Sequence, residues 1–363
     1  MYKFNVIDAD AHIDETEATW EYGRAEEKAL MPVVGYPKNP DPKRPPTAYW
    51  IVDGKRKPRR IRDDATCGST VNTRELGDVE ERLRHMDELG VDIHVIYPTL
   101  MLVQPADRPE TELAMCRSYN RWMADRCEKS RGRLRWVCVP PTHDMAATLE
   151  ELRFAKDHGA CGVLKKGDKE ADKWPADEYY YPFYEEAERL DMAICLHLGS
   201  GVPDSGNTKD FALGAFMRTQ LPTIHGVHAL IAHRIPEKYP KLRFGCIEAG
   251  ASWTPYIAYD LRRRKERQQG SRLVPTDYAL SDEVDIFTQS RFYVSCQVDE
   301  DLKTILQYIS EDMLILGSDY SHQDQAKEHA FVQAIRKRAA QGDITPQAAE
   351  KMLFANPKAF YAL

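Results

Sequence analysis

Histidine and carboxylate residues stand at three places in the chain where a short apolar run ends. Asp10 and His12 are separated by one residue in the first run, His197 ends a second run, and Asp319 ends a third. Side chains alternate along a strand, so Asp10 and His12 are expected to point to the same side. Imidazole and carboxylate groups are ligands that suit zinc, iron or manganese. The four residues together therefore predict a divalent metal site, although each one alone could simply be a hydrogen-bonding residue at a strand end.

Three further residues are candidates for the same site. Glu248 ends another apolar run, where a buried glutamate could act as a general base, bind a metal, or cap the following helix. His322 follows Asp319 by three residues and could orient a ligand or donate a proton. Glu15 would add enough carboxylate oxygen for two ions that share bridging atoms, unless it faces solvent in the acidic stretch 14–17.

These residues need a scaffold that brings distant strand ends together. Short apolar runs, typical of buried parallel strands, alternate with stretches in which apolar residues recur every three or four positions, as in helices. Eight strands alternating with helices is the pattern of a (β/α)₈ barrel, whose active sites lie at the carboxyl ends of the strands. The strands are expected at 4–10, 92–97, 134–139, 162–166, 193–197, 242–248, 292–296 and 313–319. The helices are expected at 78–89, 108–129, 145–158, 181–190, 213–239, 252–268, 301–309 and 325–340.

Two insertions account for the length beyond the barrel. A (β/α)₈ barrel takes roughly 250 residues, and the surplus falls mainly at 16–77 and 270–283. The first insertion holds a proline-rich piece at 36–46 and a predicted hairpin around Asp53-Gly54. Both would lie at the carboxyl ends of the strands, so we expect lids on a single domain that spans residues 1–363. A doubly wound sheet is disfavoured, because no Gly-x-Gly-x-x-Gly turn follows any predicted strand.

Composition and charge narrow the possible partners. The chain has 363 residues and a formal net charge of −7, which disfavours a dedicated nucleic-acid-binding protein. A basic cluster at 55–62 could receive an anionic substrate, such as a carboxylate or a coenzyme A phosphate, or could be a solvated hairpin face. No apolar run approaches the ~20 residues that cross a bilayer, and the first residues do not resemble a secretory signal. The eight cysteines contain no Cys-x-x-Cys pair, so we expect free thiols and a cytoplasmic location.

The motifs resemble the amidohydrolase superfamily, in particular the branch that includes aminocarboxymuconate-semialdehyde decarboxylase and the resorcylate-type decarboxylases. The resemblance implies a distorted barrel, a metal held by Asp10, His12, His197 and Asp319, and a small-molecule substrate. We also expect the protein to assemble as a homo-oligomer. The resemblance further implies hydrolysis or non-oxidative decarboxylation of a small carboxylate, ester, amide or ring-containing compound. The resemblance rests on Asp10-x-His12, His197, Tyr239-Pro240-Lys241-Leu242-Arg243-Phe244, Gly317-Ser318-Asp319-Tyr320 and the closing segment 353–361.

Two positions depart from the pattern of that branch. Asp10 stands where many relatives carry a histidine, and Glu248 stands where the decarboxylases place a catalytic histidine. A carboxylate-rich pair of irons is suited to O₂ activation, so a nonheme di-iron monooxygenase on the same barrel is the alternative reading. Zinc, manganese and iron, and one ion or two, therefore stay open as cofactors. Glu248, Asp319 and His322 are the expected catalytic residues, as bases toward water in hydrolysis or as acids toward a carbanion in decarboxylation.

Overall fold

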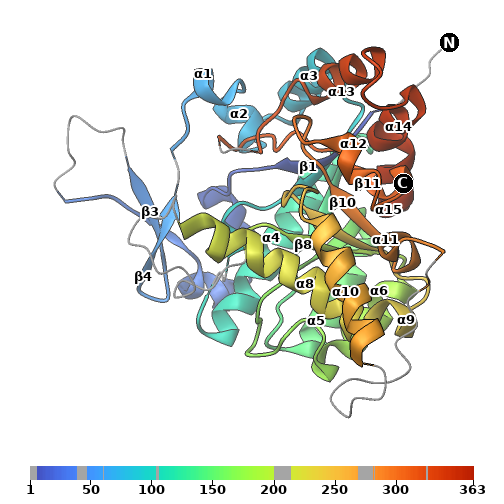
Figure 1. Cartoon of the computed structure of the whole chain (residues 1–363). Coiled ribbons are helices and arrows are strands. Elements are labelled where there is room, and N and C mark those ends of the chain that lie inside the picture. Colours follow the sequence, from blue (N-terminus) through green and yellow to red (C-terminus); the bar gives the residue numbers. More distant parts are fainter. Residues whose placement is uncertain are drawn as a thin grey trace.

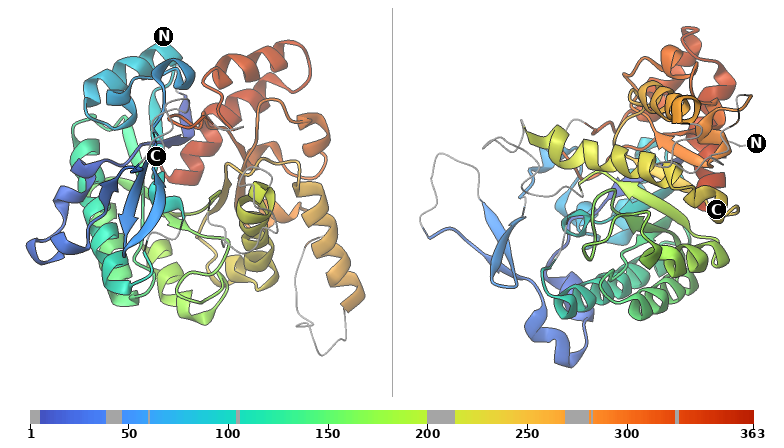
Figure 2. Two further views of the ribbon diagram at one scale, coloured as in Figure 1. Left: turned by 90° about the vertical axis from the view of Figure 1, so that its left-hand side faces the viewer. Right: turned by 60° about the horizontal axis from the view of Figure 1, so that its bottom comes forward.

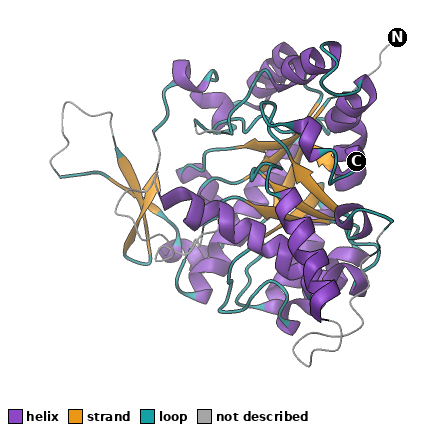
Figure 3. Cartoon of the chain, in the orientation of Figure 1, coloured by secondary structure: helices purple, strands orange, loops and turns teal. Residues whose placement is uncertain are grey.

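The computed structural model describes residues 6–38, 47–59, 61–103, 106–199, 214–268, 281, 283–323 and 326–363. Its centre is a sheet of eight strands in the order β1-β5-β6-β7-β8-β9-β10-β11, parallel at every pairing. Helices surround these strands (Figure 3). The strands are β1 (Ile7–His12), β5 (Ile93–Tyr97), β6 (Leu134–Cys138), β7 (Ala160–Lys165), β8 (Ala193–His197), β9 (Phe244–Ile247), β10 (Phe292–Ser295) and β11 (Leu314–Ile315).

The two edge strands of this sheet meet. The Ala9 amide donates a hydrogen bond to the Leu316 carbonyl at 3.0 Å, and the His12 amide donates to the Tyr320 carbonyl at 2.8 Å. The predicted (β/α)₈ barrel is therefore confirmed. It is distorted at β11, which has two residues instead of the seven expected, and beyond this strand the chain turns at Asp319, where φ is 51°.

The helices begin and end where the sequence offers suitable caps. At the start of α3 (Val79–Leu89) the Asp78 carboxylate accepts the Glu81 amide, and Gly90 ends the helix with a φ of 74°. The other helices of the barrel are α4 (Pro109–Glu128), α5 (Met145–Asp157), α6 (Tyr181–Arg189), α8 (Leu221–Ala232), α9 (Ile235–Lys238), α10 (Thr254–Gln268), α11 (Ile286–Gln289), α12 (Leu302–Ile305), α13 (Phe331–Ala340), α14 (Pro346–Glu350) and α15 (Asn356–Tyr361).

Three predicted helices are shorter or divided. The one expected at 213–239 consists of a π-helical turn (Phe216–Gln220), α8 and α9, and the left-handed φ of 61° at Arg234 separates the last two. The one expected at 325–340 begins at Phe331, because the preceding segment follows the barrel rim, with the Glu328 amide donating to the Ser318 carbonyl. The helix expected at 301–309 is the single turn α12.

The first insertion contains a small antiparallel sheet of β2 (Val33–Gly35), β3 (Ala48–Val52) and β4 (Lys55–Arg59). The predicted hairpin is confirmed, with Asp53 and Gly54 at φ of 51° and 74° in the turn. The small sheet projects to one side of the barrel (Figures 1 and 2). The Asp53 carboxylate accepts from the Arg108 amide at 3.1 Å and so ties the turn to the start of α4. Residues 39–46 of the proline-rich piece, and 270–280 and 282 of the second insertion, lie outside the described residues.

Side chains from the last turn of α15 pack against the strands of the barrel. A Cβ atom on Gly245 would lie 2.3 Å from Cζ of Phe360, so only glycine fits opposite this ring. The Tyr361 hydroxyl donates to the Ala9 carbonyl at 2.7 Å, and the Tyr97 hydroxyl, 2.7 Å away, therefore donates to Tyr361. The closing helix thus fixes strand β1 at the residue before Asp10.

The state of the cysteines, and the length and apolar character of the helices, match the expectations from the sequence. All eight cysteines are buried with free thiols, as the absence of paired motifs predicts. Among the described residues, none of the helices combines the length and the apolar character that a bilayer crossing needs.

Candidate metal centre

Six buried histidine and carboxylate side chains meet at the carboxyl ends of the strands. They come from β1, from the end of β8, from the residue after β9 and from the loop after β11, and each residue is at most 5% exposed. Their candidate ligand atoms fall into two overlapping groups, and within each group all of these atoms lie within 4.8 Å of one another. The first group is Asp10, His12, His197 and Glu248, and the second is His12, Glu248, Asp319 and His322. The structure therefore brings together every sequence-predicted site residue except Glu15.

The distances between these atoms are those of neighbouring ligands on one ion. Nε2 of His12 is 3.2 Å from Oδ1 of Asp10 and 3.5 Å from Oδ1 of Asp319, and Nε2 of His197 is 3.1 Å from Oδ1 of Asp10. Two ligands that are each about 2.1 Å from an ion lie about 3.0 Å apart at octahedral angles and about 3.4 Å apart at tetrahedral angles. The observed spacing fits a divalent cation of ordinary size.

Backbone carbonyls fix the tautomers of two imidazoles. Nδ1 of His12 donates to the Pro98 carbonyl and Nδ1 of His197 donates to the Leu198 carbonyl, both at 2.8 Å. In the neutral ring, Nε2 therefore carries a lone pair, and in both rings it faces Asp10. Nε2 of His12 is buried and makes no hydrogen bond with the described residues. Lone pairs and carboxylate oxygens at this distance repel each other unless a cation lies between them, so the donor set fits a metal ion.

The ionisation of the site suits metal binding. Burial lowers the pKa of His12, which favours the neutral ring that a metal needs. Burial alone would raise the pKa of Asp10, but the two neighbouring imidazoles, His197 first and then His12, outweigh it and hold this pKa well below its usual range. An ionised carboxylate thus lies between two imidazole nitrogens.

Two of the carboxylates stand on strained backbone. Glu248 and Asp319 have φ of 65° and 51°, a left-handed conformation that is unfavourable for residues with side chains and recurs at functional sites. The amides of Ala251 and Ser252, which precede α10, bond to the Glu300 carboxylate at 2.9 and 2.7 Å. The turn at Glu248 instead directs its carboxylate into the cluster, where Oε2 is 3.4 Å from Nδ1 of His197.

Glu15 is placed differently from the prediction. Its carboxylate accepts the amides of Thr99, Leu100 and Met101 at 2.8 to 3.3 Å, at the start of a 3-10 turn (Leu100–Leu102). Glu15 belongs to neither group of candidate ligands, and it is buried, not facing solvent. Burial raises its pKa to about 7, against the effect of these hydrogen bonds. Its structural role is to hold the loop after β5 against the loop after β1.

A buried network behind the site holds two of the carboxylates. The Asp8 carboxylate accepts the Ser318 amide at 2.9 Å and the Asp10 amide at 3.2 Å, and so links the backbone next to Asp319 with the backbone of Asp10. Nε2 of His94 is 3.4 Å from Oδ2 of Asp8, and Arg82 donates to Nδ1 of His94 at 3.1 Å. Such outer contacts orient ligands and typically change metal affinity about 10- to 100-fold.

Three of the six cations in the basic cluster at 55–62 are paired with carboxylates of the same chain. Arg60 lies outside the described residues. Lys55 and Arg56 are exposed, as a solvated hairpin face requires, whereas Arg62 is buried. The ion pairs join Lys55 to Asp107, Arg59 to Glu17 and Arg62 to Asp14.

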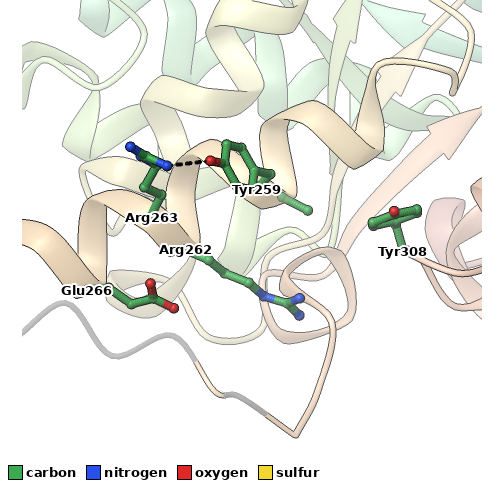
Figure 4. Close-up of a pocket in the computed structure, with 6 residues that line it drawn as sticks. Tyr259, Arg262, Arg263, Glu266 and Tyr308 are labelled. Atoms are coloured by element: carbon green, nitrogen blue, oxygen red, sulfur yellow. Dashed lines mark hydrogen bonds between the residues drawn. The ribbon is translucent and has the colours of Figure 1, made fainter.

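A shallow cleft of about 250 Å³ lies on the outside of the barrel (Figure 4). None of the six clustered residues lines it, and Arg263 donates to the Tyr259 hydroxyl within its wall. It is formed by Ala258, Tyr259, Arg262, Arg263, Glu266 and Tyr308. The cleft is therefore separate from the candidate metal centre.

His329, in the segment that follows Asp319, is expected to make the fold less stable in acid. His329 stacks on Tyr320 at 5.1 Å between centroids, and burial first, then the charges of Lys327, His85 and Arg82, lowers its pKa to about 4. The pKa of His329 is near 6.5 in the unfolded state and about 4 in the folded state. As the pH falls below 6.5 the unfolded state takes up the proton first, so the stability present above pH 6.5 is lost as the pH falls through 4. We expect the free energy of unfolding to fall by up to about 3 kcal/mol from pH 7 to pH 4 through this residue.

Urea unfolding at the two pH values tests this expectation. His329→Phe keeps the stacked ring and should lose less stability than the wild type on acidification. His158→Phe is the matched control, because His158 is exposed and stacks on Phe154 at 4.1 Å. Equal acid sensitivity of the wild type and His329→Phe would contradict the prediction.

Comparison with known proteins agrees with this fold and site. The family model described as Amidohydrolase matches residues 7–363. The gamma-resorcylate decarboxylase of Polaromonas sp. is 24% identical over 263 residues, 69% of this chain and 79% of that protein. That of Rhodococcus jostii is 26% identical over 258 residues, 67% of this chain and 75% of that protein.

Solved structures share the whole fold. An amidohydrolase of Mycobacterium avium subsp. paratuberculosis has a TM-score of 0.77 at 17% identity, covering 99% of this chain and 100% of that one. The 5-carboxyvanillate decarboxylase of Novosphingobium aromaticivorans with bound manganese has a TM-score of 0.71 at 18% identity, covering 99% and 97%. Since the family match spans nearly the entire barrel, including all six clustered residues, the chain belongs to the amidohydrolase family.

Proposed function

We propose that the protein is a metal-dependent decarboxylase that removes CO₂, without an oxidant, from a small aromatic acid with a hydroxyl group beside the carboxylate. The observation that carries this proposal is the buried set Asp10, His12, His197 and Asp319, with two ring nitrogens fixed toward carboxylate oxygens. The named curated relatives are gamma-resorcylate decarboxylases, and solved neighbours act on 5-carboxyvanillate or 2,6-dihydroxybenzoate. These names support a hydroxybenzoate as substrate.

A divalent cation held by these four residues would supply positive charge that anchors the substrate oxygens and stabilises negative charge as it develops. The chain itself must supply a proton. Nδ1 of His322 is 2.7 Å from Oδ1 of Asp319, and Nε2 of His322 bonds to the Thr99 hydroxyl at 3.0 Å. A proton held by this pair can pass from Asp319 to the ring carbon as its bond to the carboxylate carbon breaks. The products are CO₂ and the corresponding phenol.

After β9 this chain has Glu248, where the decarboxylases that it resembles place a catalytic histidine. Its carboxylate accepts protons and cannot donate one while ionised, so the acid role falls to the Asp319–His322 pair. Hydrolysis, with Glu248 as base toward water, uses the same cluster and differs in needing no release of CO₂. The comparisons do not support the di-iron monooxygenase alternative, which would need O₂ for every turnover.

The test uses the full chain loaded with manganese and offered 2,6-dihydroxybenzoate and 5-carboxyvanillate, with the phenol and CO₂ measured in air and under argon. We expect one CO₂ per phenol at equal rates in both atmospheres. Chelation should remove the activity and added Mn²⁺ should restore it. Turnover that requires O₂, or hydrolysis of phenyl esters with no CO₂ release from either acid, would refute the proposal.

A further inference from the structure

Lys166 is a buried lysine directly after β7, and the proposed reaction does not use it. Strands β7 and β8 run parallel, with Lys165 opposite Leu196. The next residue along each chain is Lys166 on one side and His197 on the other. Paired residues of neighbouring parallel strands point to the same face, so Lys166 is directed to the face of the sheet that carries His197.

The adjacent lysine confirms this direction. Nζ of Lys165 lies 4.0 Å from the centroid of the Tyr180 ring, in the turn that leads into α6, and it forms an ion pair with Glu170. Lys165 therefore points to the helices outside the barrel. Because successive residues of a strand point to opposite faces, Lys166 points into the mouth of the barrel.

The Lys166 ammonium has no anion of its own. The residue is 5% exposed, and its Nζ forms neither a hydrogen bond nor an ion pair with the part of the chain that the structure describes. The two carboxylates whose charges act on it most belong to Glu170 and Glu112. Glu170 is paired with Lys165 and accepts the Lys166 amide at 3.1 Å. Glu112 accepts both the amide and Nδ1 of His143, at 3.0 and 2.7 Å.

A buried ammonium that lacks a paired anion is unfavourable. Burial lowers the pKa of Lys166, against the opposing charges of the two glutamates. A negatively charged ligand in the mouth would supply the missing counter-charge. A carboxylate suits this position better than a phenol, because its usual pKa is about 4 and that of a phenol is about 10, so only the carboxylate is ionised at neutral pH.

This carboxylate is not the one that leaves as CO₂. The departing group gives up its negative charge during the reaction, so a cation held on it would stabilise the substrate more than the transition state. A second carboxylate keeps its charge throughout. Binding it favours substrate and transition state equally, which lowers KM and leaves kcat unchanged.

We propose that Lys166 binds a second carboxylate on the substrate ring, so that the acid decarboxylated here is a hydroxylated aromatic dicarboxylate. This inference rests on the proposed function and narrows its substrate. 5-Carboxyvanillate is an acid of this class, whereas 2,6-dihydroxybenzoate has one carboxylate and would leave the ammonium unpaired.

The test compares two phenols that differ by one carboxylate. Vanillate carries the carboxylate that remains after 5-carboxyvanillate loses CO₂, and guaiacol is the same ring without it. With the full chain loaded with Mn²⁺, calorimetry should show vanillate binding at least about 30-fold more tightly than guaiacol. Lys166→Met, which keeps a long side chain without its charge, should lose this preference.

Turnover and stability give two further measurements. Lys166→Met should raise KM for 5-carboxyvanillate by a similar factor with kcat nearly unchanged, and KM for 2,6-dihydroxybenzoate should not rise. Without ligand, the variant should be at least as stable to heat as the wild type, because an unpaired buried charge is removed. Lys169→Met is the matched control, because Lys169 is an exposed lysine of the same loop, and it should keep every wild-type value.

A wild type that binds vanillate no more tightly than guaiacol, or binds neither, overturns the inference, as does a preference that persists in Lys166→Met. A loss of stability in Lys166→Met would show that the ammonium has a partner within the fold and would also overturn it. CO₂ release with an unchanged preference in Lys166→Met refutes only the role of this lysine. A preference that is lost in Lys166→Met, without CO₂ release from either acid by the wild type, refutes only the proposed function.

Discussion

Asp319→Asn is expected to decarboxylate hydroxybenzoates about 10²- to 10⁴-fold more slowly than the wild type, the usual contribution of a positioned acid. The side-chain amide of the variant cannot carry the proton that the Asp319–His322 pair holds, and so cannot pass it to the ring carbon; in the wild type Oδ1 of Asp319 is 2.7 Å from Nδ1 of His322. The backbone of the turn should persist, because the backbone N–H of Asp319, which donates to the Asp10 carbonyl at 2.9 Å, is unchanged by the substitution. The loss should therefore appear in kcat.

Single-turnover rates at equal manganese content measure this loss separately from weaker metal binding. Asp260→Asn is the matched control, since it removes a carboxylate paired with His228 outside the cluster, and it should keep the wild-type rate. If Asp319→Asn, with its metal sites filled, keeps more than about a tenth of the wild-type kcat, Asp319 does not deliver the proton.

Asp10→Asn is expected to abolish the stabilisation of the fold by manganese. A ligand at 1,000 times its Kd stabilises the native state by about 4.1 kcal/mol, and the wild type should gain this much. The variant should gain almost nothing, because Oδ1 of Asp10 is the atom that lies next to both His12 and His197, at 3.2 and 3.1 Å. Without metal the variant should be at least as stable as the wild type, since an amide can donate to an imidazole nitrogen where a carboxylate cannot.

Thermal and urea unfolding with and without Mn²⁺ measure both effects. Asp260→Asn again serves as control and should show the wild-type response to the metal. A variant that loses stability without metal would show that Asp10 is needed for the fold itself. A variant that keeps the wild-type gain with Mn²⁺ would remove Asp10 from the ligand set.

The barrel and most of the cluster could be predicted from the sequence, because buried parallel strands are nearly continuous apolar runs and their polar ends are conspicuous. Alternation placed Asp10 and His12 correctly on one side. It could not place Asp8, because the register of β1 against β5 shifts between Asp8 and Ala11. The Asp8 carboxylate lies 3.4 Å from Nε2 of His94, and no local pattern predicts the irregularity beside it.

The residues that were missed depend on contacts between distant segments. Glu15 looks like a further ligand in the sequence, yet amides 84 to 86 residues away bind its carboxylate. Arg82 was expected only as part of a helix, and its buried contact with His94 follows from how α3 packs beside β5. Asp8 opposite His94 in neighbouring strands was the available signal, because two buried polar residues at paired positions tend to be partners.

The hydroxyl contact between Tyr361 and the Ala9 carbonyl joins residues 352 positions apart. During synthesis, strand β1 leaves the ribosome long before Asp319, His322 and Tyr361 exist, so the nascent chain carries Asp10 and His12 without the partners that fix them. The complete donor set forms only when the loop after β11 docks beside β1, a late and slow event for contacts of such separation. The protein must therefore acquire its metal after translation, from whichever ions the cell then supplies, since availability as much as affinity decides which divalent cation a site receives.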